Sequence, residues 1–400
     1  MLSIAAFLLF LCPAASVASA CKPPTPPPNK NSTRCRLPAR NDVHLSVGFD
    51  FAGDCVPSTG DLGAFMMFVD FSDAEAPSYD PPKELRDVFF PDAVDWYTKA
   101  SYGALSLNVT ADVSRYYRMP APAASYNWDS GLSYEQHQAY IQDALQAYTA
   151  NGTRPPPPET EVLYIVPTRF ASSYMTRSIA FHGRANTREG AYVARKTVTF
   201  GTDPFLTWGY GALSHETGHT MCLPDYYPYA SGLETRYYVG GWSAMGDIGG
   251  PGPDFFSWDK WRLGWLSDDN IDCVVEHGTS EHTLTPLEVT GGTKAVVIAA
   301  NETAALVVEA RVAEGLDSKV CAPGVLLYTV DTTIPTGEGP LRVLDANPSS
   351  GGCGDGDGEL NDATLSLDGG KSTYDVPGWG ITVKLLSKDG GKFKVQVDYS

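Results

Sequence analysis

Basic residues are scarce in this sequence. It contains 29 Lys and Arg against 47 Asp and Glu among 400 residues, which gives a formal net charge of −18. A surface this acidic repels the phosphates of nucleic acids and the headgroups of anionic membranes. We therefore expect no nucleic-acid partner.

Long apolar runs are missing after residue 20. Every later apolar stretch is shorter than the roughly 18 residues that a membrane-spanning helix needs. Residues 1–20 combine an apolar run from Leu2 to Cys12 with small residues at the end, which is typical of a cleaved signal peptide. This leader lacks the usual Lys or Arg, so a lipoprotein acylated at Cys21 is an alternative. We expect a secreted, extracellular protein with no membrane attachment after the leader is cleaved.

Asparagine sequons and cysteines agree with a secretory route. Asn-x-Ser/Thr sequons, the acceptors of N-glycosylation, occur at Asn31, Asn108, Asn151 and Asn301. Of 8 cysteines, 7 remain after the leader is removed: Cys21, Cys35, Cys55, Cys222, Cys273, Cys321 and Cys353. An oxidising compartment predicts disulfides, and the odd number requires at least one free or intermolecular thiol. The pairing does not follow from the sequence.

Glycine and proline are abundant, at 39 and 30 residues, which favours strands, turns and loops over a helical bundle. After a Pro- and Cys-rich segment over 21–60, the pattern predicts strands at 63–71 and 161–166, with a further candidate at 191–200. Apolar spacing predicts helices at 91–100, 134–149 and 206–220. From about residue 271, short Val/Thr/Leu-rich segments at 295–299, 305–310, 324–330 and 392–399 predict strands. The expected fold is α+β, with a mixed domain over 61–270 and a β-rich domain over 271–400.

The run His215-Glu216-Thr217-Gly218-His219 carries the strongest chemical signal. Two imidazoles four residues apart lie on one face of a helix, where both can reach one cation. Glu216 beside them can take a proton from water activated by that cation. With 7 His in the chain, such a pattern arises by chance on the order of 0.01 times. The alternative is a helix with two unrelated surface histidines.

Asp225, six residues after His219, is the expected third ligand. If the helix ends just after His219, the chain can turn back so that the carboxylate completes a three-ligand site with one position left for water. Such an open site is typical of catalytic rather than structural zinc. Glu234 is the alternative third ligand, but Pro224 and the short loop favour Asp225. We interpret Cys222 as a disulfide or core residue before a ligand.

These residues resemble the metal-binding element of the M6 (immune inhibitor A-like) metallopeptidases, a branch of the metzincins. The resemblance is carried by HETGHTMCLPD at 215–225 and extends to FVDFSD at 68–73, SYGALSL at 101–107, GWSAM at 241–245 and KWRLGWL at 260–266. It implies a metzincin-like fold for the 61–270 domain, a zinc ion held by His215, His219 and Asp225, and Met245 as an apolar floor beneath the metal. The family has glycine where this chain has Cys222, and glycine readily takes the positive φ of such a turn.

The sequence thus predicts a secreted zinc endopeptidase with Glu216 as general base and a protein or peptide as substrate. An oxyanion donor is expected among four nearby tyrosines: Tyr226, Tyr227, Tyr237 and Tyr238. The competing hypothesis is a non-catalytic secreted binding protein that retains the fold and binds glycans or surfaces. In that case Tyr374 and Trp379 of the β-rich domain would stack on sugar rings, although packing is the simpler interpretation.

Two minor hypotheses concern metals and latency. The acidic run over 355–362 offers oxygens for Ca²⁺, but it lacks the glycine of an EF-hand loop, so a solvated acidic loop is favoured. A cysteine within 21–60 could occupy the metal in a latent form. The remaining histidines have no ligand spacing and are interpreted as ordinary surface or core residues: His44, His137, His182, His277 and His282.

Overall fold

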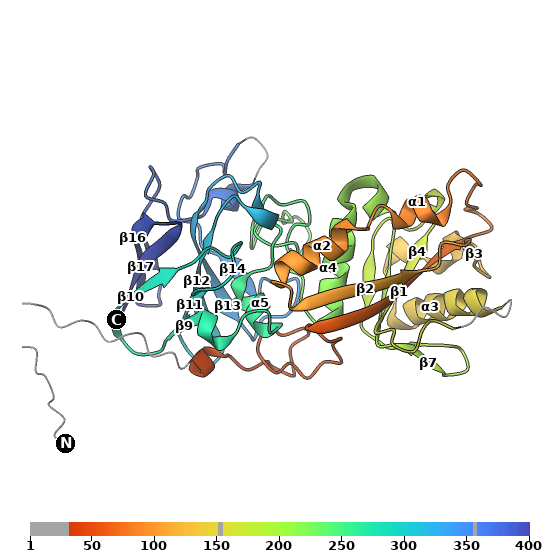
Figure 1. Ribbon diagram of the computed structural model, residues 1–400, viewed down its shortest axis with the longest axis horizontal. Coiled ribbons are helices and arrows are strands. Elements are labelled where there is room, and N and C mark those ends of the chain that lie inside the picture. The colour runs from red at the N-terminus through yellow and green to blue at the C-terminus, as the bar shows by residue number, and fades with distance from the viewer. Residues whose placement is uncertain (1–31, 151–154, 355–357) are drawn as a thin grey trace, which may run out of the picture.

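The computed structural model describes residues 32–150, 155–354 and 358–400. It is a mixed structure of several sheets and few helices, which confirms the α+β class. Figure 1 shows one half with β1 to β8 and α1 to α4, and another with β9 to β17 and α5. The expected leader, Cys21, the sequons at Asn31 and Asn151, and the start of the acidic run at 355 lie outside the described residues.

The first half is built on a mixed sheet. Its strands are β1 Gly60–Asp70, β2 Leu105–Ala111, β3 Tyr117–Arg118, β4 Val162–Pro167, β5 Ile179–Phe181 and β8 Lys196–Thr199, with a separate hairpin of β6 Ala185–Asn186 and β7 Tyr192–Ala194. The sheet order is β2-β1-β4-β8-β5, and β3 also pairs with β1. All pairs are parallel except β5 with β8, which is antiparallel. The strand β5 therefore forms one edge of this sheet.

Helices cover both faces of this sheet because β1 is apolar on both sides. Its alternate residues Ala64, Met66 and Phe68 pack with α1, α2 and α4, while Phe65 and Met67 pack with α3. The helices are α1 Pro82–Arg86, α2 Asp92–Ala100, α3 Tyr134–Thr149 and α4 Tyr210–Thr220, preceded by a π-helix η5 Pro204–Trp208. Helix α3 begins with a capping box of Ser133 and Gln136.

Two predicted elements of this half are divided. The helix expected over 206–220 is interrupted at Gly209, whose φ of 54° lies outside the helical region and separates η5 from α4. The strand expected over 191–200 becomes β7 and β8, because β7 pairs with β6 whereas β8 enters the main sheet between β4 and β5. Periodicity alone does not reveal that two adjacent segments pair with different partners.

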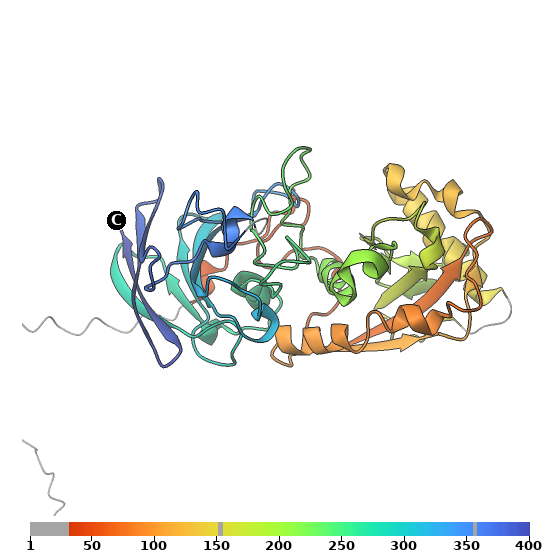
Figure 2. The same cartoon turned by 90° about the horizontal axis from the view of Figure 1, so that it is seen from above.

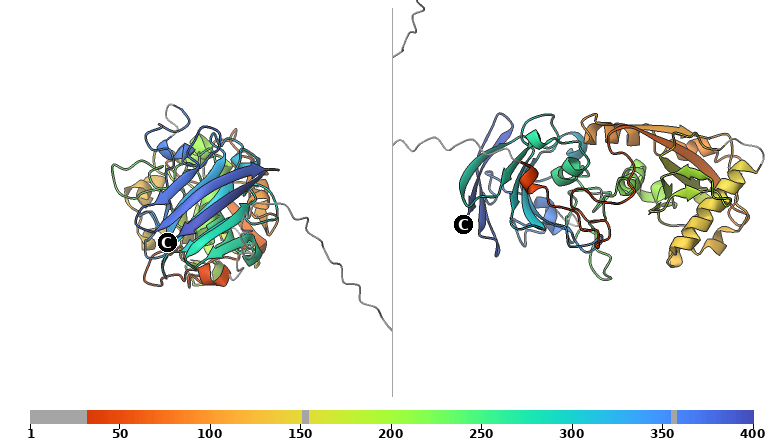
Figure 3. Two further views of the ribbon diagram at one scale, coloured as in Figure 1. Left: turned by 90° about the vertical axis from the view of Figure 1, so that its left-hand side faces the viewer. Right: turned by 90° about the horizontal axis from the view of Figure 1, so that it is seen from below.

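The second half is a two-sheet sandwich. Its strands are β9 Ile271–Val274, β10 Gly278–Leu284, β11 Ala295–Ala299, β12 Ala304–Arg311, β13 Gly324–Asp331, β14 Leu341–Val343, β15 Thr373–Val376, β16 Ile381–Asp389 and β17 Lys392–Tyr399. One sheet has the order β14-β13-β12-β11-β9 and the other β10-β17-β16-β15; Figure 3 (left) looks onto the second. Apolar residues of both sheets, such as Val308 and Val395, form the core between them. The β-rich expectation for this region is confirmed.

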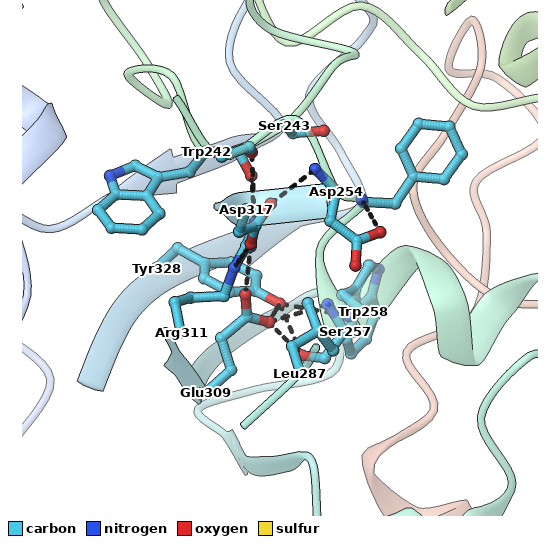
Figure 4. Close-up of polar contacts among 12 residues, drawn as sticks. Trp242, Ser243, Asp254, Ser257, Trp258, Leu287, Glu309, Arg311, Asp317 and Tyr328 are labelled. Carbon is cyan, nitrogen blue, oxygen red and sulfur yellow. Dashed lines mark hydrogen bonds and ion pairs between the residues drawn. The ribbon is translucent and has the colours of Figure 1, made fainter. Parts of the chain in front are cut away.

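The two halves share one large apolar core. Helix α5 Ser257–Arg262 contributes Trp258 and Trp261 to it, and β12 and β13 contribute Val307 and Tyr328. A buried ion cluster lies at the same junction: Arg311 contacts Glu309 and Asp317 (Figure 4), and also Glu288. We call it the Arg311 cluster. Short 3-10 helices occupy the connections: η1 Ser32–Cys35, η2 Ala123–Tyr126, η3 Trp128–Ser130, η4 Arg169–Ala171, η6 Asp268–Asn270, η7 Gly315–Asp317 and η8 Glu359–Asp362.

The segment before β1 is tied to both halves by disulfides. Cys35 pairs with Cys273 of β9, and Cys55 pairs with Cys222 just after α4. A third disulfide joins Cys321 to Cys353. Figure 3 (right) shows this segment, in red and brown, running from the sandwich toward α4. Disulfides are confirmed. Of the two interpretations of Cys222, disulfide or core residue, the structure shows the disulfide, and neither Cys35 nor Cys55 is available as a latency thiol.

Candidate metal centre

Helix α4 lies at the centre of the molecule and carries the two histidines. Figure 2 shows it between the first sheet and the sandwich half. Every residue from Ala212 to Thr220 is buried, so the helix is fixed on all sides. On one side Gly218 allows Met245 to approach closely, since a Cβ at Gly218 would lie only 2.8 Å from the Met245 sulfur. Met245 thus packs against α4 next to the histidines.

Backbone carbonyls orient both imidazoles. His215 Nδ1 lies 2.8 Å from the carbonyl of Ala244, and His219 Nδ1 lies 2.8 Å from the carbonyl of Leu223. A carbonyl only accepts, so each Nδ1 carries a hydrogen, and a neutral ring then presents the lone pair of its Nε2. The two Nε2 atoms are 3.1 Å apart. Histidines that bind metals are commonly oriented in this way, by a hydrogen bond from the ring nitrogen that does not face the metal.

Asp225 completes a group of three, which we call the ligand triad. Its Oδ1 lies 3.2 Å from His215 Nε2 and 3.1 Å from His219 Nε2. That oxygen is buried, and when both imidazoles are neutral it has no hydrogen-bond donor among the described residues. Within residues 32–150, 155–354 and 358–400, this is the single set of three His, Cys, Asp or Glu side chains close enough to hold one ion. Glu234, the alternative ligand, is exposed and outside it.

The turn after α4 brings Asp225 back to the histidines. Cys222 has a φ of 65°, in the left-handed conformation that glycine adopts readily. For a residue with a Cβ this conformation costs roughly 1–2 kcal/mol. The turn expected from the spacing is therefore present despite the departure at Cys222, whose side chain is bonded to Cys55.

Asp225 is itself held by residues that the sequence analysis missed. The Tyr229 hydroxyl donates to Asp225 Oδ2, and the Asp225 N–H donates to Thr336 Oγ1 at 2.9 Å. The N–H of Gly337 donates to the Asp225 carbonyl at 3.1 Å. Thr336 and Gly337 follow β13 in the sandwich half, more than a hundred residues away, so no local pattern could have indicated them.

The charges of the triad are strongly coupled. Burial lowers the pKa of His219, but the Asp225 carboxylate outweighs this and raises the pKa to about 9. Burial also acts to raise the pKa of Asp225, yet the two imidazoles hold it well below its usual range. Without a cation the triad therefore retains a proton near neutral pH. Two neutral nitrogens and one carboxylate oxygen are a donor set suited to Zn²⁺, so the residues fit that ion, and binding it would release the proton.

Glu216 and two members of the triad, His219 and Asp225, line a cavity of about 540 Å³. Burial raises the pKa of the Glu216 carboxyl above its ordinary value, a direction that suits a group exchanging protons. Residues Ile179 and Ala180 of the edge strand β5 line the same cavity. The site is thus both charged and accessible.

Of the four tyrosines considered as oxyanion donors, Tyr227 lines this cavity. Its ring stacks beside His215 with centroids 6.2 Å apart. Tyr226 is fully buried and its hydroxyl donates to Asp259 at 2.6 Å, so Tyr226 is not available as a donor. Tyr237 is 54% exposed, and Tyr238 packs under the guanidinium of Arg342. Of these four tyrosines, Tyr227 therefore remains the candidate oxyanion donor.

His44 and His182 also line the cavity, which the sequence analysis did not anticipate. Their rings meet edge to face at 5.4 Å. One lies in the segment before β1 and the other follows β5, so neither has a spacing relative to the motif. The other three histidines are as expected: His137 is buried against Trp128, and His282 and His277 contact Asp272 and Tyr399.

The remaining predicted sites are less developed. Glu359 and Asp362 of the acidic run accept hydrogen bonds from the 350–351 turn, while 355–357 lie outside the described residues. Asn108 and Asn301 are exposed, as glycosylation requires. Tyr374 and Trp379 pack half-buried against the sandwich core, which supports the packing interpretation.

Comparison of the sequence with models of known protein families finds no match, and no curated protein matches it significantly. None of the helices in the described part of the chain has the length and apolar character needed to cross a bilayer.

Proposed function

We propose that this protein is a secreted zinc metalloendopeptidase of the M6-like, metzincin type. One observation carries the proposal: His215 Nε2 and His219 Nε2 converge on a buried Asp225 oxygen that has no other hydrogen-bond donor among the described residues. This group lies beside Glu216 at an open cavity. The motifs at 68–73, 101–107, 241–245 and 260–266 support the family resemblance.

The side chains divide the work of hydrolysis. His215, His219 and Asp225 would hold the ion, which when bound supplies a Lewis acid that acidifies water and polarises a carbonyl. Glu216 accepts the proton of the attacking water and later donates it to the departing amine. Burial raises the pKa of Tyr227 well above its ordinary value, so its phenol keeps its proton and can donate to the developing oxyanion.

The edge strand β5 supports a peptide as substrate. It pairs antiparallel with β8 along one side, and in the described sheet its other side has no partner strand. Because Ile179 and Ala180 also line the cavity, an extended peptide that adds to this edge would pass beside Glu216.

Secretion is part of the proposal. Three disulfides are typical of an oxidising compartment, and two sequons are exposed. The apolar start of the sequence supports the same route.

Glu216→Gln tests the mechanism directly. The amide has the same shape but accepts no proton, so casein hydrolysis should fall by about 10²–10⁴-fold, while zinc bound per chain, measured by elemental analysis, stays as in the wild type. Glu234→Gln is the control and should retain both zinc and activity. Unchanged turnover in Glu216→Gln, or a wild-type protein that binds no zinc, would contradict the proposal.

A further inference from the structure

The end of helix α4 is closed by a Schellman motif. The Leu223 N–H donates to the Gly218 carbonyl at 3.1 Å, and the Cys222 N–H donates to the His219 carbonyl at 2.9 Å. These two bonds form together only when the backbone of Cys222 is in the left-handed conformation, and its φ is 65°. The conformation of Cys222 therefore decides whether the motif forms.

Two of the three members of the ligand triad depend on this motif. The Leu223 carbonyl, whose direction the motif sets, accepts from His219 Nδ1 at 2.8 Å. Asp225 follows two residues later and reaches His219 Nε2 at 3.1 Å. If Cys222 leaves the left-handed region, both the orientation of His219 and the position of Asp225 change.

Cys222 is bonded to a partner that is fixed by other contacts. The Cys55 carbonyl accepts from Arg195 Nη1 at 3.3 Å, and the next residue, Val56, is buried and donates to the Thr220 carbonyl at 3.0 Å. The disulfide therefore joins the turn to a segment that already lies against the end of α4.

We infer that the Cys55–Cys222 disulfide is a positioning element of the metal centre: it holds Cys222 in the left-handed conformation that a glycine would otherwise adopt unaided. The inference rests on the zinc site of the proposed function. It makes zinc affinity dependent on a bond outside the ligand set, and it assigns Cys222 a role through His219 and Asp225 rather than on the metal itself.

Three double variants separate positioning from general stability. Cys55→Ser/Cys222→Ser removes the bond and keeps a Cβ at the left-handed position. Cys55→Ser/Cys222→Gly removes the bond but places glycine there. Cys321→Ser/Cys353→Ser removes a disulfide that joins other segments and is the control.

Zinc affinity is measured by competition with a chelator, and amide hydrogen exchange over residues 216–226 is measured in zinc-free protein. The Ser/Ser variant should bind zinc about 10- to 100-fold more weakly than the wild type, as for other groups that orient metal ligands, and exchange faster in this segment. The Ser/Gly variant should recover most of the zinc affinity and most of the protection from exchange. The control should match the wild type in both measurements. Recovery by glycine is the outcome that a merely stabilising disulfide would not produce.

Wild-type affinity and exchange in the Ser/Ser variant would overturn the inference, as would equal losses in the Ser/Ser and Ser/Gly variants. If the Ser/Ser variant does not fold, the Ser/Gly variant decides: zinc affinity near the wild type is expected, and a loss of tenfold or more contradicts the role of the left-handed turn. If the wild type binds no zinc, the proposed function fails, while the exchange rates in zinc-free protein still test the positioning role.

Discussion

Two of the buried clusters of charged side chains in the described part of the chain differ in one respect. In the Arg311 cluster, the guanidinium lies 2.9 Å from Glu309 and 2.7 Å from Asp317, and all of these side chains are fully buried (Figure 4). Burial raises the pKa of Glu288, the third acid, to about 9, so it keeps a proton at neutral pH. The cluster thus contains its own cation, which both remaining carboxylates contact. The ligand triad instead turns three acceptors toward one another beside a cavity.

The comparison teaches that buried charge by itself does not mark a functional site. The triad differs in that its nitrogen and oxygen atoms are arranged to suit a cation that the chain itself does not supply, and a cavity leads to them. The two clusters are also connected, because Arg311 Nη2 donates to the Trp242 carbonyl at 3.2 Å and the Gly252 carbonyl at 3.3 Å. The turn between them supplies the Ala244 carbonyl that orients His215.

The largest effect is expected from Arg311→Met. This change leaves buried acids without their cation and should lower the free energy of unfolding by about 3–5 kcal/mol. Urea denaturation of the zinc-free protein measures it. Arg86→Met, at an exposed pair with Asp87, should change stability by about 0.5 kcal/mol or less and is the control. Equal effects of the two variants would contradict the prediction that burial makes the Arg311 cluster sensitive to the loss of its cation.

The next effect concerns zinc. At a free zinc concentration one hundred times Kd, the wild type should gain about 2.7 kcal/mol of stability. Asp225→Asn should lose most of this gain, because the neutral amide is a poorer ligand. Thermal unfolding with and without zinc measures the gain. Glu234→Gln should retain it, and the reverse pattern would move the third ligand to Glu234.

The two clusters also differ in how well each could be predicted from the sequence. The His215, Glu216, His219 and Asp225 group could be predicted because helical spacing and a short turn are local. Glu309, Arg311 and Asp317 are close in the sequence, but no motif marks their spacing, and their burial depends on the packing of β12 against the 242–254 turn. Thr336 is distant in sequence from Asp225, and His44 and His182 were interpreted as ordinary residues because they have no spacing relative to the motif. In contrast, α3, β1 and β4 follow from periodicity within single elements.

A smaller effect, on the pH dependence of stability, is expected from His137, a buried histidine that belongs to neither cluster. Burial, and secondarily the nearby His182, lowers its pKa to about 3. Below pH 6.5 the unfolded chain takes up a proton that the folded protein refuses, so stability falls as pH drops from 6.5 toward 3. The loss should reach about 2 kcal/mol at pH 5.

His137→Gln should reduce this dependence by about 2 kcal/mol at pH 5 in zinc-free protein, as measured by urea midpoints between pH 7 and 5. A slope of the same sign should remain, because burial also lowers the pKa of His182, to about 4. The same substitution at the exposed His277 is the control, and a slope in His137→Gln equal to that of the wild type would contradict the prediction.

The smallest effect is expected at the surface pair of Lys384 and Asp398, 2.8 Å apart. Hydrogen bonds from Lys384 and Thr279 lower the pKa of Asp398 to about 2. Its contribution is present above about pH 4 and is lost as pH falls toward 2. Asp398→Asn should cost less than about 1 kcal/mol at pH 7 by urea denaturation. A loss as large as that of Arg311→Met would contradict the importance we give to burial.

The order in which the chain emerges from the ribosome gives the N-terminal ties a further meaning. Cys55 is made 167 residues before Cys222, and Cys35 is made 238 residues before Cys273. The disulfide can secure the turn that carries Asp225 once Cys222 has been made, but Thr336, which the sandwich half supplies, follows 111 residues after Asp225. The ligand triad is therefore fully supported only after most of the polypeptide has been synthesised and oxidised, and any activity that depends on the triad is deferred until then.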